Sequence, residues 1–274
     1  MNLNNTKISI LGCGWLGFPL AIHLANKGYV VKGSTRSPQK LAAFHQYKIL
    51  PFLIEVNKRI KGNNIPLFFQ SDILFINIPP GRKRKDVVRS HPLQITTILE
   101  HAQKFDIQKI IFISSTSVYG NVNRIVTEAE ELKPETPSAR ALVEAENLLI
   151  GQTAIEVTIL RMGGLVGLKR PAGRFLAGKA GIKNGLAPVN MVHQEDCISI
   201  ITAIIEQEKW GTIYNVCSDE HPTKKDFYTH QATKQGFELP TFLEEENFVY
   251  KEVSNYKVKK ELNYRFKFPD PMGY

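Results

Sequence analysis

The stretch ISILGCGWLG, residues 8–17, constrains the fold more than any other part of this chain. It opens on an apolar run with the β-branched residues Ile8 and Ile10, which predicts a buried strand. From Trp15 onward, leucines recur at helical spacing until Gly28, a residue type that commonly ends a helix. The glycines between these two segments therefore lie at a strand-to-helix turn.

Each glycine of this turn has a role in a dinucleotide-binding site. Gly12 permits the tight turn, Gly14 lets a pyrophosphate approach the backbone, and Gly17 lets the helix pack closely on the strand. The helix N-terminus adds unpaired N–H groups and a partial positive charge, which favour phosphates. A packing turn in another α/β fold is the alternative. We expect a pyrophosphate to lie against Gly12, Gly14, Trp15, Leu16 and Gly17.

Strand and helix patterns alternate along the first part of the chain. Further strands are predicted over 29–33, 49–56, 73–78, 109–113 and 155–160, and helices over 39–44, 93–104 and 139–150. This alternation predicts an α/β fold with a Rossmann-type, doubly wound parallel sheet. The expected dinucleotide-binding core covers residues 1–162.

The pattern becomes looser after residue 163. Glycine-rich loops there separate two helices, expected over 195–207 and 224–235, and one strand, expected over 212–216. We therefore expect residues 163–274 to form mostly a small C-terminal α/β substrate lobe. Segments near 190–216 are expected to return to the core.

The end of the second predicted strand bears on the choice of cofactor. An NAD site usually places Asp or Glu there for the ribose hydroxyls, whereas an NADP site omits the acid and supplies Arg. Here the segment is GSTRS, residues 33–37, and Arg36 stands where the 2′-phosphate would bind. NADP is therefore favoured over NAD. The other cofactor contacts expected at strand ends are Thr35, Ser37, Ile78 and Pro79.

Composition argues against several classes of protein. Of the 274 residues, 43% are hydrophobic and 22% charged, as in ordinary globular proteins. No apolar run reaches the ~18 residues of a membrane span, and the polar start MNLNNTK leads straight into a strand, so we expect neither a membrane segment nor a signal peptide. Cys13, Cys197 and Cys217 show no metal-ligand or disulfide spacing, which predicts a cytoplasmic protein without a metal site.

The net charge of +9, with the basic loop at residues 81–85, raises the question of nucleic-acid binding. Aromatic residues are not interleaved with this charge, as a single-strand binding platform would require. No helix-turn-helix or zinc signature accompanies it. A solvated basic loop is the simpler interpretation, and nucleic acid is not the expected partner.

Several motifs resemble the extended short-chain dehydrogenase/reductase family, the sugar-nucleotide epimerases and dehydratases. The segment IFISSTSVYG, residues 111–120, resembles the family's fifth strand and the Ser that follows it. TILRMGGLVG resembles the sixth strand with its glycine turn, and VHQEDCISII resembles a His-x-x-Asp helix start with His193 and Asp196. IYNVCSDEHPTKKDFY resembles the late strand and helix. The resemblance spans nearly the whole chain and implies an NAD(P)-dependent oxidoreductase or epimerase-like activity.

One departure from the family concerns catalysis. Family members carry a Tyr and a Lys four residues apart on the helix after strand five, where Ser138 and Leu142 stand here. The Tyr moves a proton and the Lys lowers its pKa, and neither Ser nor Leu can replace them. The resemblance implies Ser115 as the matching catalytic Ser, and Tyr119 is the nearest candidate proton carrier. Lobe-side contacts are expected from Arg161, Arg174 and His193.

These observations lead to two hypotheses of different classes. The first is an NADP(H)-binding oxidoreductase or epimerase-like enzyme without the usual Tyr-x-x-x-Lys pair. The alternative is a non-catalytic NADP-binding sensor or scaffold. The expected partner is a small-molecule substrate, for which the resemblance suggests a nucleotide-sugar-like compound. The resemblance is also compatible with a homodimer.

Overall fold

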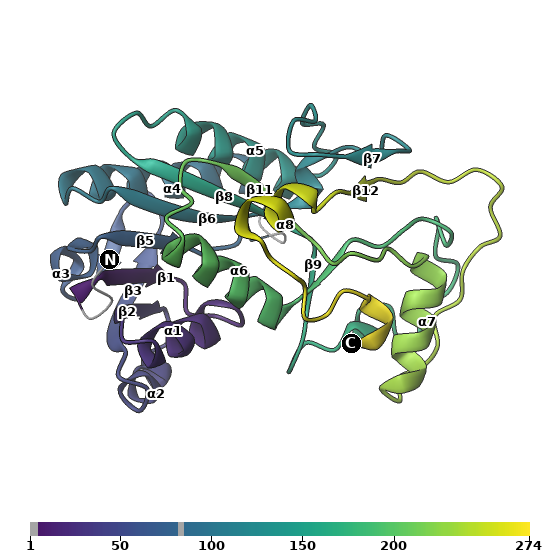
Figure 1. The fold of residues 1–274 in the computed structure, drawn as a ribbon, viewed down its shortest axis with the longest axis horizontal. Coiled ribbons are helices and arrows are strands. Elements are labelled where there is room, and N and C mark those ends of the chain that lie inside the picture. Colours follow the sequence, from purple (N-terminus) through teal and green to yellow (C-terminus); the bar gives the residue numbers. More distant parts are fainter. Residues whose placement is uncertain (1–4, 82–84) are drawn as a thin grey trace. The chain divides into compact units, whose positions relative to one another are not determined.

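A computed structural model describes residues 5–81 and 85–274 of the chain (Figure 1). Its first half contains β1 (Lys7–Leu11), α1 (Gly17–Asn26), β2 (Val30–Thr35), α2 (Leu41–His45), β3 (Leu50–Val56), β4 (Ile60–Gly62), α3 (Ile65–Phe69), β5 (Ile73–Ile76), α4 (Val87–Lys104), β6 (Lys109–Ser115), β7 (Ile125–Val126) and α5 (Pro137–Ile150). Its second half contains β8 (Glu156–Met162), β9 (Gly164–Val166), β10 (Met191–His193), α6 (Gln194–Glu206), β11 (Ile213–Val216), α7 (Lys224–Lys234), β12 (Glu252–Val253) and α8 (Tyr256–Leu262).

Eight of the strands form one sheet in the order β11-β8-β6-β5-β1-β2-β3-β4. Strand β1 pairs in parallel with β2 and with β5, and the β2–β3 and β5–β6 pairs are parallel as well (Figure 1). All of β5 is buried, as expected for a parallel sheet covered on both faces. The strand order reverses beside β1, so the predicted doubly wound, Rossmann-type fold is confirmed.

The edge of the sheet beyond β3 differs from the prediction. The segment after β3 contains β4, which pairs antiparallel with β3, and the short helix α3. Both elements were missed because three and five residues are too few for a periodic pattern to emerge. Helix α4 also begins at Val87, before the predicted start at residue 93. The helix accommodates Pro92 in its second turn.

The chain divides into two compact units that alternate along the sequence. Unit 1 contains residues 1–118, 134–160 and 204–213, and unit 2 contains residues 119–133, 161–203 and 214–274. Unit 1 contains the glycine turn after β1 and the strands from β1 to β6. Unit 2 has a hydrophobic cluster of its own, formed by Val166, Ala172, Val189, Met191 and Phe227.

Unit 2 also contains two small parallel sheets, β9–β10 and β7–β12. Residues 82–84 of the basic loop considered for nucleic-acid binding lie outside the described residues. Among the helices that the structure describes, none combines the length and the apolar character needed to cross a membrane.

Candidate functional site

The three glycines of the turn between β1 and α1 differ in how much space surrounds them. Gly12 has φ +106°, and a Cβ there would lie 2.7 Å from the Asn77 carbonyl oxygen. A Cβ on Gly17 would lie 2.3 Å from the Gly12 carbonyl oxygen, so the helix packs against the turn with no room for a side chain. A Cβ on Gly14, by contrast, would meet no atom within 4 Å. Gly14 is therefore not required by packing, which leaves its open side for a ligand.

Neighbouring strands hold this turn in place. The Gly12 N–H donates to the Ser34 hydroxyl over 3.0 Å, and the Cys13 N–H donates to the Ser34 carbonyl over 2.8 Å. The Asn77 side chain donates to the Gly12 carbonyl over 3.1 Å. Ser34 lies near the end of β2 and Asn77 follows β5, so both come from strands that flank β1. Sequence reasoning missed these two residues, although a polar residue at the end of a buried parallel strand is a usable signal.

Helix α1 presents its N-terminal end to the turn. Its first residue is Gly17, and Pro19 lies in the first turn, where the missing N–H is tolerated. The Phe18 N–H donates to the Gly14 carbonyl over 3.0 Å. No acidic residue stands in the first turn, so nothing on the helix opposes the partial positive charge of its N-terminus.

A cavity of about 440 Å³ opens beside the glycine turn. It brings together seven of the predicted cofactor residues, namely Gly12, Gly14, Thr35, Arg36, Ser37, Ile78 and Pro79. The other three, Trp15, Leu16 and Gly17, do not line it. The wall also includes Lys40, Asn77 and Gln94, which sequence reasoning did not identify. Among the described residues, this lining contains two cationic side chains, Arg36 and Lys40, and no carboxylate, so the cavity favours an anionic ligand.

Arg36 stands exposed at the rim of this cavity, just after β2. The two hydroxyl residues beside it are partly engaged in local bonds. The Thr35 hydroxyl accepts from the Ser37 N–H over 3.1 Å, and the Ser37 hydroxyl donates to the Gln39 side chain over 2.7 Å. These short-range bonds shape the loop. Among the described residues, no carboxylate forms an ion pair with the Arg36 guanidinium.

The three thiols are buried and unpaired with one another. Burial raises the pKa of Cys13, which lies in the glycine turn, to about 12. Burial likewise raises the pKa of Cys197 and of Cys217. A thiolate is the reactive form of cysteine, so none of these groups suits nucleophilic chemistry near neutral pH.

Helix α5 carries none of the family's proton-transfer groups. Ser138 lies in its first turn and Leu142 is buried. A buried carboxylate, Glu146, accepts a hydrogen bond from the Ser114 hydroxyl near the end of β6. Glu146 is therefore engaged within the core of unit 1, on the side of the helix that packs on the sheet.

Ser115 ends strand β6 and is half-buried. Its hydroxyl oxygen accepts from the Ser117 N–H over 3.1 Å, a local turn bond that leaves the hydroxyl proton able to donate. The Ser115 hydroxyl can therefore donate a further hydrogen bond.

Tyr119 belongs to unit 2 and is almost wholly buried, with 1% of its surface exposed. Its phenol donates to the Asn215 side-chain carbonyl over 2.8 Å and accepts from the Arg161 guanidinium over 2.8 Å. Burial raises the pKa of Tyr119 to about 12, although Arg161 acts in the opposite direction. Both hydrogen-bonding positions of the phenol are thus occupied by buried protein groups.

The predicted lobe contacts have different environments within unit 2. Arg161 is buried and lies with its guanidinium carbon 5.0 Å from the centre of the Tyr119 ring. His193 packs on Phe268, with ring centres 3.8 Å apart, and burial lowers its pKa. Arg174 is exposed. Of these three residues, only Arg174 has a side chain that is exposed to solvent.

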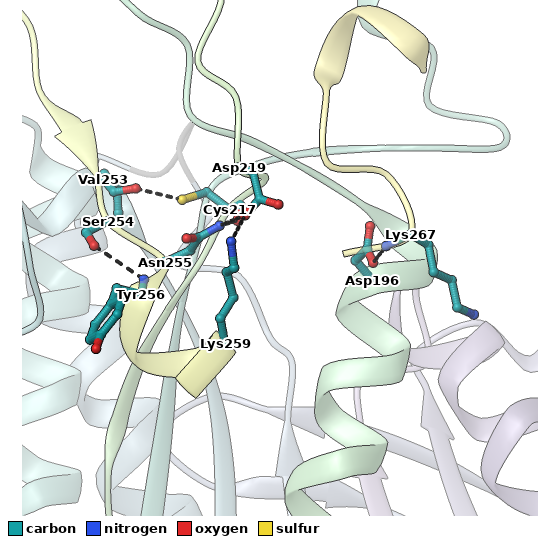
Figure 2. A network of polar contacts seen from close by, with 9 residues as sticks. All are labelled: Asp196, Cys217, Asp219, Val253, Ser254, Asn255, Tyr256, Lys259 and Lys267. Atoms are coloured by element: carbon teal, nitrogen blue, oxygen red, sulfur yellow. Dashed lines mark hydrogen bonds and ion pairs between the residues drawn. The ribbon is translucent and has the colours of Figure 1, made fainter. Parts of the chain in front are cut away.

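Asp196 ties the C-terminal segment to the start of α6 (Figure 2). This buried carboxylate accepts from the Tyr264 hydroxyl over 2.7 Å, from the Lys267 N–H over 2.8 Å and from the Phe268 N–H over 3.2 Å. The His-x-x-Asp pattern therefore has a structural meaning in this chain: its Asp anchors a backbone segment.

A second set of contacts fastens the loop after β11 (Figure 2). The Cys217 thiol donates to the Val253 carbonyl over 2.9 Å, and the Asn255 side chain donates to Asp219 over 2.9 Å. Lys259 pairs with the same Asp219 carboxylate at 2.7 Å. These contacts hold the segment from β12 to α8 against the loop within unit 2.

No group of three or more His, Cys, Asp or Glu side chains suited to hold a metal ion occurs within residues 5–81 and 85–274.

Comparisons with known proteins agree with this arrangement. The profile of the NAD dependent epimerase/dehydratase family matches residues 8–217. Protein YeeZ of Escherichia coli (strain K12) is 34% identical over 269 residues, which are 97% of each chain.

Two solved structures illustrate the shared fold. UDP-glucuronic acid 4-epimerase from Bacillus cereus, solved with UDP-glucuronic acid and NAD, has a TM-score of 0.80 and 20% identity, over 98% of this chain and 96% of that one. A conserved protein of unknown function from Silicibacter pomeroyi has a TM-score of 0.76 and 23% identity, over 98% and 95% of the two chains. The family match, the YeeZ relative and the Rossmann-type sheet together lead to one conclusion: this chain belongs to the NAD dependent epimerase/dehydratase family.

Proposed function

We propose that this protein binds NADP(H) in the cavity beside the glycine turn of unit 1. One observation carries the proposal: a single cavity is lined by both Gly14 and Arg36, and none of the described residues that line it is Asp or Glu. The pyrophosphate would lie against the turn and the N-terminus of α1, as in other dinucleotide-binding folds. When bound, this cofactor supplies hydride transfer.

The preference for NADP over NAD rests on Arg36. Similar structures such as the Bacillus cereus epimerase were solved with NAD, so the fold alone does not distinguish the two cofactors. In this chain, the position after β2 lacks the acid that would bind the ribose hydroxyls and repel a phosphate. A guanidinium can bond two phosphate oxygens at once. Thr35 and Ser37 add hydroxyl groups to the same loop.

Arg36→Ala should weaken NADPH binding by about tenfold or more and leave NADH binding nearly unchanged, because only NADPH has the 2′-phosphate. Calorimetric titration of both cofactors measures the two affinities. Arg140→Ala, at an exposed arginine on α5, is the matched control and should change neither affinity. Equal losses for NADPH and NADH in Arg36→Ala would show that Arg36 does not recognise the 2′-phosphate.

For the reaction, we propose an oxidoreductase or epimerase-like activity in which α5 carries no proton. Ser115 would donate a hydrogen bond to a substrate carbonyl or alcohol. Its hydroxyl oxygen accepts from the Ser117 N–H, and its hydroxyl proton is still able to donate, which supports this role. Tyr119 is the other candidate, but its buried phenol and raised pKa fit a structural role better. Oxidation of NADPH, followed at its absorbance band against a panel of carbonyl compounds and nucleotide sugars, tests for this activity.

The burial of Tyr119 and the absence of the Tyr-x-x-x-Lys pair favour a second candidate function. A protein that binds NADP(H) and performs no turnover, as a sensor or scaffold, needs the cofactor cavity but no proton carrier. Tight NADPH binding without oxidation across the whole panel would support this second function over the first.

For the substrate, we propose a small anionic molecule of the nucleotide-sugar kind. The Bacillus cereus epimerase was solved with UDP-glucuronic acid, which suggests the class. In this chain, residues 157–194 contain no Asp or Glu and several cationic residues, among them the exposed Lys169, Arg170 and Arg174. Such a segment favours phosphate-bearing ligands. Protection of this segment from hydrogen exchange by UDP-glucuronic acid, but not by glucuronic acid, is the expected result.

Tyr119→Phe separates the structural role of this residue from a catalytic one. The change removes a buried partner of both Arg161 and Asn215, so we expect the free energy of unfolding to fall by about 1–3 kcal/mol. Affinity for NADPH should stay unchanged. Urea unfolding and cofactor titration measure the two quantities. Once a substrate is known, a loss of turnover of about 10²–10⁴-fold with unchanged stability would instead identify the phenol as the proton carrier.

A further inference from the structure

A second cavity, of about 450 Å³, is also lined by Arg36. It shares Arg36, Ser37 and Ile54 with the cavity beside the glycine turn, so Arg36 stands at a wall common to both. The rest of its lining comes from the β3–β4 hairpin and includes two charged side chains, Glu55 and Lys61. The β3–β4 hairpin therefore brings the charges of Glu55 and Lys61 to a cavity that Arg36 also lines.

The hairpin is held tightly against the sheet. Strand β4 pairs antiparallel with β3, with Lys61 directly opposite Glu55. A Cβ on Gly62 would lie 2.0 Å from the Leu53 carbonyl oxygen, so the two strands approach too closely for any other residue there. The Asn63 side chain also accepts from the Leu53 N–H over 3.0 Å. Lys61 is thus carried by a backbone that is fixed against β3, in the lining of the cavity that Arg36 also lines.

Among the described residues that line this cavity, the cations Arg36 and Lys61 outnumber the one carboxylate, Glu55. The first 54 residues of the chain contain no Asp or Glu, and Glu55 is the first acidic residue. Its carboxylate accepts a hydrogen bond from the Asn57 side chain over 3.0 Å. Within the described part of the chain, no carboxylate lies at salt-bridge distance from the exposed Lys61. The Lys61 ammonium is therefore available to an anion that also contacts Arg36.

We propose that Lys61 is a second specificity-determining residue for the 2′-phosphate of NADP(H), acting beside Arg36. This inference rests on the proposed cofactor function. In it, strand β4 positions the second cation, the Lys61 ammonium, for the phosphate. A phosphate dianion can bond the Arg36 fork and a Lys61 ammonium together, because the two groups approach it from different elements. Glu55 opposes such binding by repulsion, and Lys61 offsets that repulsion from the facing position.

Three single variants test this assignment by the sign of their effects. Lys61→Ala should weaken NADPH binding by about three- to fivefold and change NADH binding less than about twofold, as expected for an exposed charge contact. Glu55→Gln should strengthen NADPH binding by about two- to threefold, because it removes a like charge. Lys58→Ala, an exposed lysine of the same hairpin that lines neither cavity, should leave both affinities unchanged.

Titration calorimetry at low and high salt measures these affinities, and circular dichroism checks that each variant is folded. Selective loss of NADPH affinity in Lys61→Ala that shrinks at high salt is the supporting result. A Lys61→Ala variant that behaves like Lys58→Ala, while Arg36→Ala still loses NADPH selectively, would overturn the role of Lys61 and leave the proposed function standing. Absence of NADPH binding by the unaltered protein would overturn both.

Discussion

Gly14→Val is expected to abolish measurable NADPH binding, a loss of at least about 100-fold, while the protein stays folded. The physical reason is that a Cβ at Gly14 meets no protein atom within 4 Å, so we expect the valine side chain to extend into the space through which a pyrophosphate approaches. Gly14 is also absent from the residues with positive φ, so its backbone suits an L-residue. Fluorescence titration with NADPH and circular dichroism measure binding and folding.

Gly17→Val serves as the contrasting variant. A Cβ at this position would lie 2.3 Å from the Gly12 carbonyl oxygen, so this change should disrupt the packing of α1 and lower stability as well as binding. A folded Gly14→Val protein with unchanged NADPH affinity would mean that the turn is only a packing feature of an α/β fold.

Asp196→Ala is expected to lower the free energy of unfolding by about 3–5 kcal/mol, because it removes a buried carboxylate and leaves three donors without their acceptor. The loss should be concentrated in the C-terminal segment that Asp196 anchors. Hydrogen exchange of a peptide covering residues 263–274 measures this, and we expect the Lys267 and Phe268 amides to exchange faster in the variant.

Two further variants sharpen this test. The Tyr264 hydroxyl and the Lys267 N–H both donate to the same oxygen of Asp196, Oδ1. Asp196→Asn keeps one acceptor oxygen that can take this place, so it should lose much less stability than Asp196→Ala. Glu195→Ala changes an exposed acid in the same helical turn and should have little effect. Unchanged exchange of residues 263–274 in Asp196→Ala would show that this segment is held by other contacts.

The sheet and the glycine turn could be predicted because their signals are local and repeated. Strand β5 is apolar along its whole length, and a Cβ on Gly12 or Gly17 would collide with backbone atoms, so these two positions require glycine. Arg36 was identifiable for a similar reason, since its position relative to the end of β2 follows from the fold alone.

Other parts of the site depend on contacts between segments that are far apart in the sequence. Ser34 and Asn77 hold Gly12 from the ends of two strands that are far apart in the sequence, and their position at strand ends does not say which backbone group each one contacts. Strand β4 is only three residues long, so the place of Lys61 in the same cavity lining as Arg36 emerges only in three dimensions. The partners of Tyr119 lie 42 and 96 residues away along the chain, which is why its burial could not be decided from the segment around it.

The hydrogen bonds from Ser34 and Asn77 have a consequence for how a dinucleotide would associate with this protein. They shape the turn before any ligand arrives, so the loss of backbone entropy at Gly12 and its neighbours occurs during folding rather than during binding. Preorganisation of this kind lets more of the interaction energy appear as affinity. Ser34 and Asn77 can therefore affect the affinity for a dinucleotide without touching its phosphates. If their hydrogen bonds were lost, the free turn would gain backbone entropy, and binding would have to order it again.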